Sequence, residues 1–172
     1  MRERMIMLVH TSTTTLTMRR RFQVTADKVF DAWVSPDMMR RWLFTMDKTN
    51  KIAKNEPHVG GSWEIVDHRE GKDYRAIGEY IEMDRPSRLV FTFKMPQFSD
   101  MEDQITVEIM PDDNECEMIF TQVIVVPHEE GWTDQDVEKA LHDYHSQTEQ
   151  GWGYMFDGLK QLVETGKIND PF

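Results

Sequence analysis

The sequence has very little cysteine: Cys116 is the single one among 172 residues. Without a second cysteine the chain cannot form an internal disulfide. That pattern is typical of proteins in a reducing compartment, so we expect a cytoplasmic protein. Cys116 alternates in phase with Met118 and Phe120, and the sequence places no base beside it. We therefore predict a buried strand residue and not a catalytic thiol.

Positive charge is also scarce. Lysine and arginine number 20 against 31 aspartate and glutamate residues, and the formal net charge is −11. Binding to nucleic acid or to an anionic membrane needs a basic face, so we expect neither. The apolar run near the N-terminus, Met5–Val9, is too short for a signal peptide or a membrane span.

Motifs for metals, nucleotides and nucleophilic catalysis are absent from the sequence. It has no zinc-type pairing of histidines or cysteines, no phosphate-binding glycine loop and no nucleophile elbow. His142 and His145 are three residues apart, and together with Glu149 they are the one combination that could bind a metal. Their spacing is not that of a zinc site, so we expect no metal and no cofactor.

The sequence does contain a long amphipathic segment near its end, residues 146–166. Its apolar residues recur at helical spacing and share one face: Trp152, Met155, Phe156, Leu159, Leu162 and Val163. Gly166 is a good helix stop. Gly151, Gly153 and Gly158 lie inside the segment and indicate a close approach of the helix backbone to a sheet or a ligand. The apolar face either packs on a sheet or closes an apolar cavity.

The rest of the chain has mainly strand patterns. After a strand at 11–24, two short helices are expected, one from Thr25 and one from Ser35-Pro36. Antiparallel strands are then predicted at 50–54, 62–68, 74–83, 88–95, 104–110 and 115–126, joined by short turns. Thr133 with Asp136 predicts a capping box for a further helix, which either runs into the last one or breaks near Gln147.

Together these elements predict an α+β helix-grip fold. In it, a curved antiparallel sheet of six or seven strands wraps around a long C-terminal helix, and two short helices follow the first strand. The chain length fits a single domain, residues 1–172. We expect its core at residues 11–166 and loose ends at 1–10 and 167–172.

Four runs of residues carry a family pattern. The run from Arg20, RRFQVTADKVFDAWVSPDMMRRWL, combines a strand, a turn and the spaced residues Val29, Phe30, Ala32, Trp33, Pro36 and Trp42. The runs GGSWEI from Gly60 and GEYIEMDRPSRLVFTF from Gly78 add strands, and Gly151-Trp152 opens the final helix. From Arg20 to about Glu164 the chain thereby resembles START-like (SRPBCC) proteins, in the branch named after the activator of the heat-shock-protein-90 ATPase.

The resemblance implies a single helix-grip domain whose sheet and last helix enclose a cavity. Members of the wider superfamily bind lipids, hormones or polyketides, and some are cyclases or dehydratases. The co-chaperones that give the branch its name carry a partner domain that this sequence does not show. A chaperone partner is therefore not the favoured expectation for this chain.

Residues in inward strand phase or on the apolar helix face are the candidates for lining such a cavity. They are Trp42, Trp63, Ile65, Asp67, Tyr80, Phe91, Phe93, Met118, Phe120, Gln122, Trp152, Met155, Phe156 and Leu159. Asp67, Tyr80 and Gln122 are polar residues that could orient a ligand in an otherwise apolar pocket. The alternative for each of the three is a place near the end of the sheet, in contact with water.

We expect the chain to bind a small apolar or aromatic ligand in an internal cavity, since aromatic residues and methionines fall in inward phase. A cyclase- or hydrolase-type enzyme on the same scaffold is the alternative, and it needs at least two polar groups that converge on the cavity. A chaperone-cofactor module is the third hypothesis and needs an exposed patch of interface size. The expected partner is a small hydrophobic molecule, and a homodimer is left open.

Overall fold

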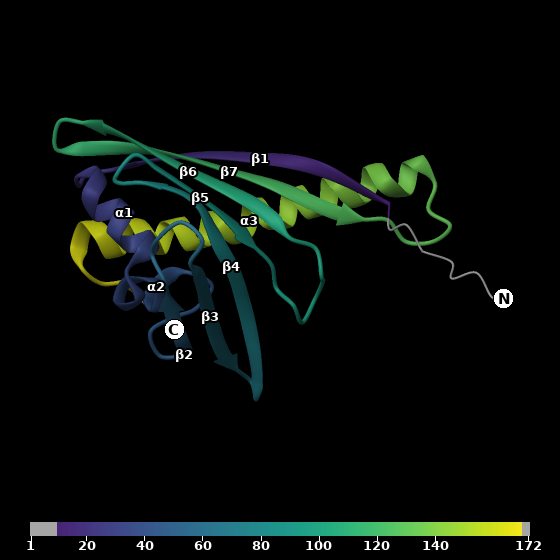
Figure 1. Cartoon of the computed structure of the whole chain (residues 1–172), viewed down its shortest axis with the longest axis horizontal. Helices are drawn as coiled ribbons and strands as arrows, with labels where there is room; N and C mark the ends of the chain where they lie inside the picture. The colour runs from purple at the N-terminus through teal and green to yellow at the C-terminus, as the bar shows by residue number, and fades with distance from the viewer. Residues whose placement is uncertain (1–9, 170–172) are drawn as a thin grey trace.

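A computed structural model describes residues 10–169 of the chain (Figure 1). The elements are, in chain order, β1 (Thr11–Phe22), α1 (Ala26–Val34), α2 (Pro36–Trp42), β2 (Asn50–Asn55), β3 (Ser62–Arg69), β4 (Lys72–Asp84), β5 (Arg88–Phe93), β6 (Asp103–Asp112), β7 (Glu115–Pro127) and α3 (Asp134–Thr165). This order of elements is the predicted α+β helix-grip arrangement. Residues 1–9 and 170–172, at the two ends that we expected to be loose, lie outside the described residues.

The strands form one seven-stranded sheet in the order β1-β7-β6-β5-β4-β3-β2. From β2 onward each strand pairs antiparallel with the next strand in the chain, and β1 pairs antiparallel with β7. Residues with positive φ lie where two hairpins reverse: Glu70 and Gly71 between β3 and β4, and Asp113 between β6 and β7. Short turns of this kind make sequence neighbours into sheet neighbours.

Strand β7 shows how the sequence alternation places side chains on the two faces of the sheet. Every second residue is buried: Cys116, Met118, Phe120, Gln122, Ile124 and Val126. The prediction that Cys116 is a buried strand residue is confirmed, and burial raises the pKa of its thiol. A thiol held in its protonated form is a poor nucleophile.

The sheet curves, and α3 runs along the inner side of β1 and β7 (Figure 1). Helices α1 and α2 lie at the end of the sheet where α3 finishes, and both contact α3. Pro36 stands at the start of α2, where its missing N–H leaves no hydrogen bond unmade. The curved sheet and these two helices therefore enclose the C-terminal half of α3.

Helix α3 is one continuous helix of 32 residues, so the alternative of a break near Gln147 is wrong. The predicted capping box is confirmed: Thr133 accepts a hydrogen bond from the Asp136 amide, and the Asp136 carboxylate accepts one from the Thr133 amide. Gly166 ends the helix in the left-handed conformation. No helix within residues 10–169 is long and apolar enough to span a membrane.

The two halves of α3 differ in burial. The residues of α3 that are buried all lie in its second half: Trp152, Phe156, Leu159, Leu162 and Val163. In the first half, apolar residues such as Val137 and Leu141 are only partly buried. The second half is thus the part of the helix that is buried in the core, while residues of the first half such as Leu141 pack against the core and stay partly exposed (Figure 1).

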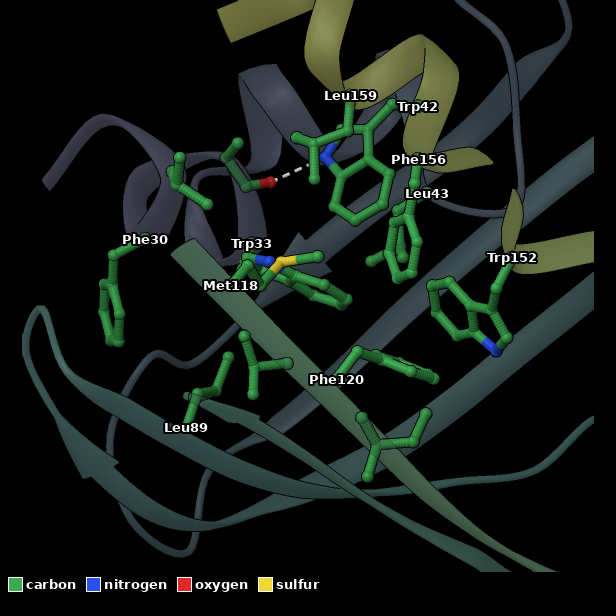
Figure 2. Close-up of a cluster of buried hydrophobic side chains, with 14 of the residues drawn as sticks. Phe30, Trp33, Trp42, Leu43, Leu89, Met118, Phe120, Trp152, Phe156 and Leu159 are labelled. Carbon is green, nitrogen blue, oxygen red and sulfur yellow. Dashed lines mark hydrogen bonds between the residues drawn. The ribbon is translucent and has the colours of Figure 1, made fainter. Parts of the chain in front are cut away.

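Aromatic rings fill the interior between α1, α2, the sheet and the second half of α3 (Figure 2). The Trp33 ring lies 4.7 Å from Trp42, 5.8 Å from Phe91 and 5.9 Å from Trp152, measured between ring centroids. Trp42 also donates a 2.8 Å hydrogen bond from Nε1 to the carbonyl oxygen of Ala32. The interior between α1, α2, the sheet and the second half of α3 is therefore a packed core and not a cavity.

Two sequence expectations about α3 and its surroundings are corrected. A Cβ at Gly151 would meet nothing within 4 Å, and one at Gly153 or Gly158 would meet only side chains at ordinary contact distance, so a close approach to the sheet does not require these glycines, and the approach to a ligand stays a prediction. Beyond the helix, the expected loose tail is held at residues 167–169. The Asn169 amide donates to the Gln161 side chain at 2.8 Å, and Ile168 contacts the helix at Gly158.

Candidate functional site

A pocket with two lobes lies between the middle of α3, the loop at residues 94–102 and the sheet. The lobes adjoin, because five residues line both of them: Phe44, Met95, Phe98, Gly151 and Met155. The β7 lobe has a volume of about 390 Å³ and is lined by residues of β7 and the start of β6. The β3 lobe has a volume of about 820 Å³ and is lined by residues of β3, β4 and the C-terminal segment.

Phe44 forms the partition between the lobes. Its φ is 59°, in the left-handed region that a bulky side chain rarely adopts. Its ring stacks on Phe93 with the centroids 4.8 Å apart and meets Trp152 edge-on at 5.1 Å. Its amide donates to the sulfur of Met155 at 3.3 Å. These contacts hold an aromatic ring in the middle of the pocket.

A chain of hydrogen-bonded groups, of which Trp152 and Gln122 are buried and Asp103 is half-buried, forms one wall of the β7 lobe. Trp152 donates from Nε1 to Gln122 Oε1 at 2.7 Å, and Gln122 donates from Nε2 to an Asp103 carboxylate oxygen at 2.8 Å. The other Asp103 oxygen accepts from the Val125 amide at 2.9 Å. Burial raises the pKa of the Asp103 carboxyl, against the effect of these two hydrogen bonds.

A second polar group lies on the wall of the β3 lobe. Asp67 is 3% exposed, and one of its carboxylate oxygens accepts from the hydroxyls of Thr45 at 2.8 Å and Thr49 at 2.5 Å. The other oxygen lies 2.7 Å from Nε of Arg69. Arg69 in turn lies over the Tyr74 ring, 4.4 Å from its centroid. The protein's own donors therefore surround the charge of Asp67.

The rim of the pocket carries apolar side chains that are exposed to solvent. Phe98 is 68% exposed, Tyr154 is 65% exposed and Tyr144 is 42% exposed. Phe98 lines both lobes, Tyr144 the β7 lobe and Tyr154 the β3 lobe. Exposing large apolar groups to water is energetically unfavourable, and such groups often mark a binding site. Here they surround the opening of the pocket.

The fourteen residues predicted to line a cavity separate into two groups. Six of them line the pocket: Trp42, Asp67, Phe93, Gln122, Trp152 and Met155. The other eight are buried in the core and line neither lobe: Trp63, Ile65, Tyr80, Phe91, Met118, Phe120, Phe156 and Leu159. The inward phase of a strand correctly predicted which residues are buried. It did not distinguish buried residues that line the pocket from those that are packed in the core.

The three polar candidates are all buried, so the alternative of a place at the sheet end in contact with water is wrong. Tyr80 lines neither lobe. Its hydroxyl accepts from Asn55 at 3.1 Å, and burial raises its pKa to about 12. Among residues 10–169, two buried polar atoms in this region of the core have no hydrogen-bond partner, Trp33 Nε1 and Asn55 Oδ1.

Several pocket residues were not among the sequence candidates. They are chiefly Phe44, Arg69, Tyr74, Met95, Phe98 and Gly151. Arg69 follows Asp67 by two positions and so shares its strand phase, which is a signal that the sequence contains. Phe44 and Phe98 lie in loops, where no periodicity indicates which way a side chain points.

Metal-ligand geometry is not found in the described part of the chain. No group of three or more His, Cys, Asp or Glu side chains within residues 10–169 is placed to hold an ion. His142, His145 and Glu149 are therefore not brought together as a site there.

Comparisons with known proteins place this fold in a family. The family model described as Activator of Hsp90 ATPase homolog 1-like protein matches residues 23–164. A protein of unknown function from Staphylococcus aureus is 25% identical, with a TM-score of 0.84 over 91% of this chain and 96% of that one. An uncharacterised protein from Rhizobium leguminosarum is 18% identical, with a TM-score of 0.70 over 91% and 98%, and shares the fold.

None of the curated proteins matches the chain. A protein from Rhodobacter sphaeroides has a TM-score of 0.67 at 22% identity, over 87% of this chain and 92% of that chain. The family model extends from the end of β1 almost to the end of α3 and so includes all residues that line the two lobes except Ile168 and Asn169. The chain therefore belongs to the family of Activator of Hsp90 ATPase homolog 1-like proteins, within the START-like superfamily.

Proposed function

We propose that this protein binds a small hydrophobic or aromatic molecule in the two-lobed pocket. The observation that carries the proposal is the wall common to both lobes, which consists of Phe44, Met95, Phe98, Met155 and one glycine. Ligand pockets are mostly apolar, have a few placed polar groups and measure about 300–1,000 Å³. Both lobes fall in this range, and Asp67 and Gln122 supply the polar groups.

The polar groups favour binding over catalysis. General acid–base catalysis needs a group that can exchange a proton with the substrate. Asp67 is surrounded by two threonine hydroxyls and Arg69, and Gln122 is held between Trp152 and Asp103. Tyr80 lies outside the pocket, with a pKa raised to about 12. These groups can orient a ligand, whereas an enzyme would need a less fully bonded acid or base.

The exposed apolar residues favour a ligand over a protein partner. Four of the large apolar residues that are exposed line the pocket: Met46, Phe98, Tyr144 and Tyr154. A chaperone-cofactor surface would need an apolar patch of interface size, about 800 Å² per partner. Side chains arranged around an opening are better suited to receiving a small molecule, because they can cover it once it is bound.

Gly151 offers a direct test of the pocket. It lines both lobes, and a Cβ there would meet nothing within 4 Å. Leucine at this position adds volume to the pocket without displacing core atoms and removes a helix-weakening glycine. We expect Gly151→Leu to stay folded and to lower the affinity for the neutral dye Nile red by at least about ten-fold, or about 1.4 kcal/mol.

Gln150→Leu is the matched control. Gln150 is the exposed residue immediately before Gly151 in the same helix and lines neither lobe, so the variant adds the same side chain outside the pocket. Its dye affinity should equal that of the unchanged protein. The proposal is overturned if Nile red does not bind the unchanged protein, or if the two variants bind it equally well.

A further inference from the structure

We infer that the ligand of this pocket is an amphipathic monocarboxylate, with its carboxylate held by Arg69 in the β3 lobe and its apolar body extending past Phe44 into the β7 lobe. The inference rests on the proposed function and adds the chemical class of the ligand. It is carried by Arg69, which lines the β3 lobe, is positioned by Asp67 and Tyr74, and has a side chain that is 56% exposed.

Arg69 is held in place before any ligand arrives. Its Nε lies 2.7 Å from the Asp67 carboxylate, and its guanidinium lies over the Tyr74 ring. Asp67 is itself fixed by the hydroxyls of Thr45 and Thr49. Within residues 10–169 the two terminal nitrogens of Arg69 donate no hydrogen bond, although Arg69 lines the β3 lobe. A guanidinium of this kind presents a planar pair of donors that matches a carboxylate.

Burial of Asp67 makes an anion at Arg69 acceptable. The Asp67 side chain is 4% exposed and has its charge compensated by Arg69 and the two hydroxyls, so it presents little negative charge to the lobe. Arg41 adds a second guanidinium to the same lobe, and it also donates from Nη2 to the Gly166 carbonyl oxygen at 2.9 Å. A carboxylate therefore finds the guanidinium groups of Arg41 and Arg69 on this wall, with Arg69 already paired to Asp67.

One carboxylate opposes the anion, and it limits the ligand's charge. Asp157 lines the β3 lobe from α3 and is exposed. The charged side chains that line this lobe, Arg41, Arg69, Asp67 and Asp157, together carry no net charge, so the lobe has no surplus of cations to balance the second charge of a dianion. A monocarboxylate is therefore favoured over a phosphate monoester with the same apolar body.

The rest of the pocket requires an apolar body. The two lobes meet at Phe44, Met95, Phe98 and Met155, and the β7 lobe continues to Ile124. Two of the polar groups there, Gln122 and Asp103, are hydrogen-bonded to each other. Lys94 is the one cation among the described residues that line the β7 lobe, and it is the competing anchor for a carboxylate.

Isothermal calorimetry with head-group variants of one alkyl chain tests the inference. Dodecanoate, dodecanol, dodecylamine and dodecyl phosphate are titrated as monomers into the unchanged protein. Dodecanoate is expected to bind about ten-fold or more tightly than dodecanol, and also more tightly than the amine and the phosphate. Arg69→Gln should remove the preference for dodecanoate over dodecanol and leave dodecanol binding intact, which also shows that the variant still has its pocket.

Two variants serve as matched controls. Arg75→Gln removes another arginine on a neighbouring strand, one that is paired with Glu64 and lines neither lobe, and should keep the preference. Lys94→Gln should keep it as well. The inference is overturned if dodecanoate and dodecanol bind equally, or if Lys94 and not Arg69 controls the preference. If none of the four compounds binds, the inference is overturned, and the binding of Nile red decides separately whether the proposed function stands.

Discussion

Two glycines of this chain lie in opposite surroundings. Gly151, in α3, borders the pocket with open space where a Cβ would be. Gly78, in β4, lies under the Trp63 indole, which crosses it to donate from Nε1 to the Thr92 carbonyl oxygen at 3.2 Å. A Cβ at Gly78 would overlap both that oxygen and the indole nitrogen. Glycine is therefore not sterically required at position 151, whereas at position 78 any larger side chain would clash.

Alanine substitution should therefore have opposite effects at the two sites. We expect Gly151→Ala to raise the free energy of unfolding by up to about 1 kcal/mol, because alanine is the better helix former and meets no neighbour. Gly78→Ala should lower it by roughly 1–3 kcal/mol or more through overpacking against Thr92 and Trp63. Urea titration of both variants measures the difference. Equal effects of one sign would contradict this account of the two sites.

Tyr80 predicts how stability responds to alkaline pH. Burial raises the pKa of its hydroxyl from 10.0 to about 12 in the folded protein. Below pH 10 the hydroxyl is protonated in the folded and the unfolded chain, so stability is unaffected. Between pH 10 and about 12 the unfolded chain loses the proton while the folded one keeps it. The free energy of unfolding should therefore fall as pH rises, by up to about 2–3 kcal/mol.

Tyr80→Phe separates this effect from the titration of other groups. The variant loses the hydrogen bond from Asn55, which gives an offset that is the same at each pH. Below pH 10 the difference in the free energy of unfolding between the unchanged protein and the variant should be constant. Above pH 10 the unchanged protein should lose stability relative to the variant. A difference that stays constant up to pH 12 would show that the Tyr80 hydroxyl is not shielded from water.

At the scale of elements, the two halves of α3 differ in how deeply they are buried. The second half buries Trp152, Phe156 and Leu159 against the sheet, and the first half has no fully buried residue. Helices gain most of their stability in proteins from packing, so the first half depends more on its own local interactions. Its N-terminus has such an interaction in the capping box of Thr133 and Asp136.

Removing the cap should loosen the first half of α3 alone. We expect Thr133→Ala to cost about 1 kcal/mol and to raise amide hydrogen exchange in residues 134–148, while exchange in residues 152–163 stays unchanged. Ser146→Ala is the control, because Ser146 is exposed in the same helix and has no capping role. Faster exchange throughout α3 would show instead that the helix opens as one unit.

At the scale of the whole molecule, the aromatic cluster joins parts of the chain that are far apart in sequence. Trp152 of α3 lies 5.9 Å from Trp33 of α1, 4.6 Å from Phe120 of β7 and 5.1 Å from Phe44 of the loop after α2, between ring centroids. Figure 2 shows it at the edge of the cluster. It is 2% exposed and also lines the β7 lobe, so it belongs to the core and to the pocket wall.

Truncating this residue tests how far the domain depends on the cluster. Trp152→Ala should lower the free energy of unfolding by about 3–5 kcal/mol, a large part of the roughly 5–15 kcal/mol of a typical domain. Trp132→Ala is the control: Trp132 is only partly buried, near the start of α3, and should cost clearly less. A loss of only about 1–2 kcal/mol for Trp152→Ala would show that few atoms pack against its ring.

Local patterns in the sequence determined the elements of this fold. Alternation placed Cys116, Met118 and Phe120 inside the sheet, helical spacing placed Trp152 and Leu159 on the inner face of α3, and capping residues marked where that helix starts and ends. These features depend on residues within a few positions of one another. The family pattern from Arg20 to Glu164 then identified how the elements assemble, which the family model over residues 23–164 confirmed.

Only the tertiary structure decided where the hollow lies. Phe91, Phe120 and Phe93 share the inward phase, yet the first two meet Trp33 and fill the core, while Phe93 stacks on Phe44 at the pocket. Whether an inward side chain packs or faces open space depends on partners from distant segments. Part of the pocket wall comes from loops such as residues 94–102, which have no periodicity. A sequence specifies which residues are buried, but the volume left between them is set by how all of them pack together.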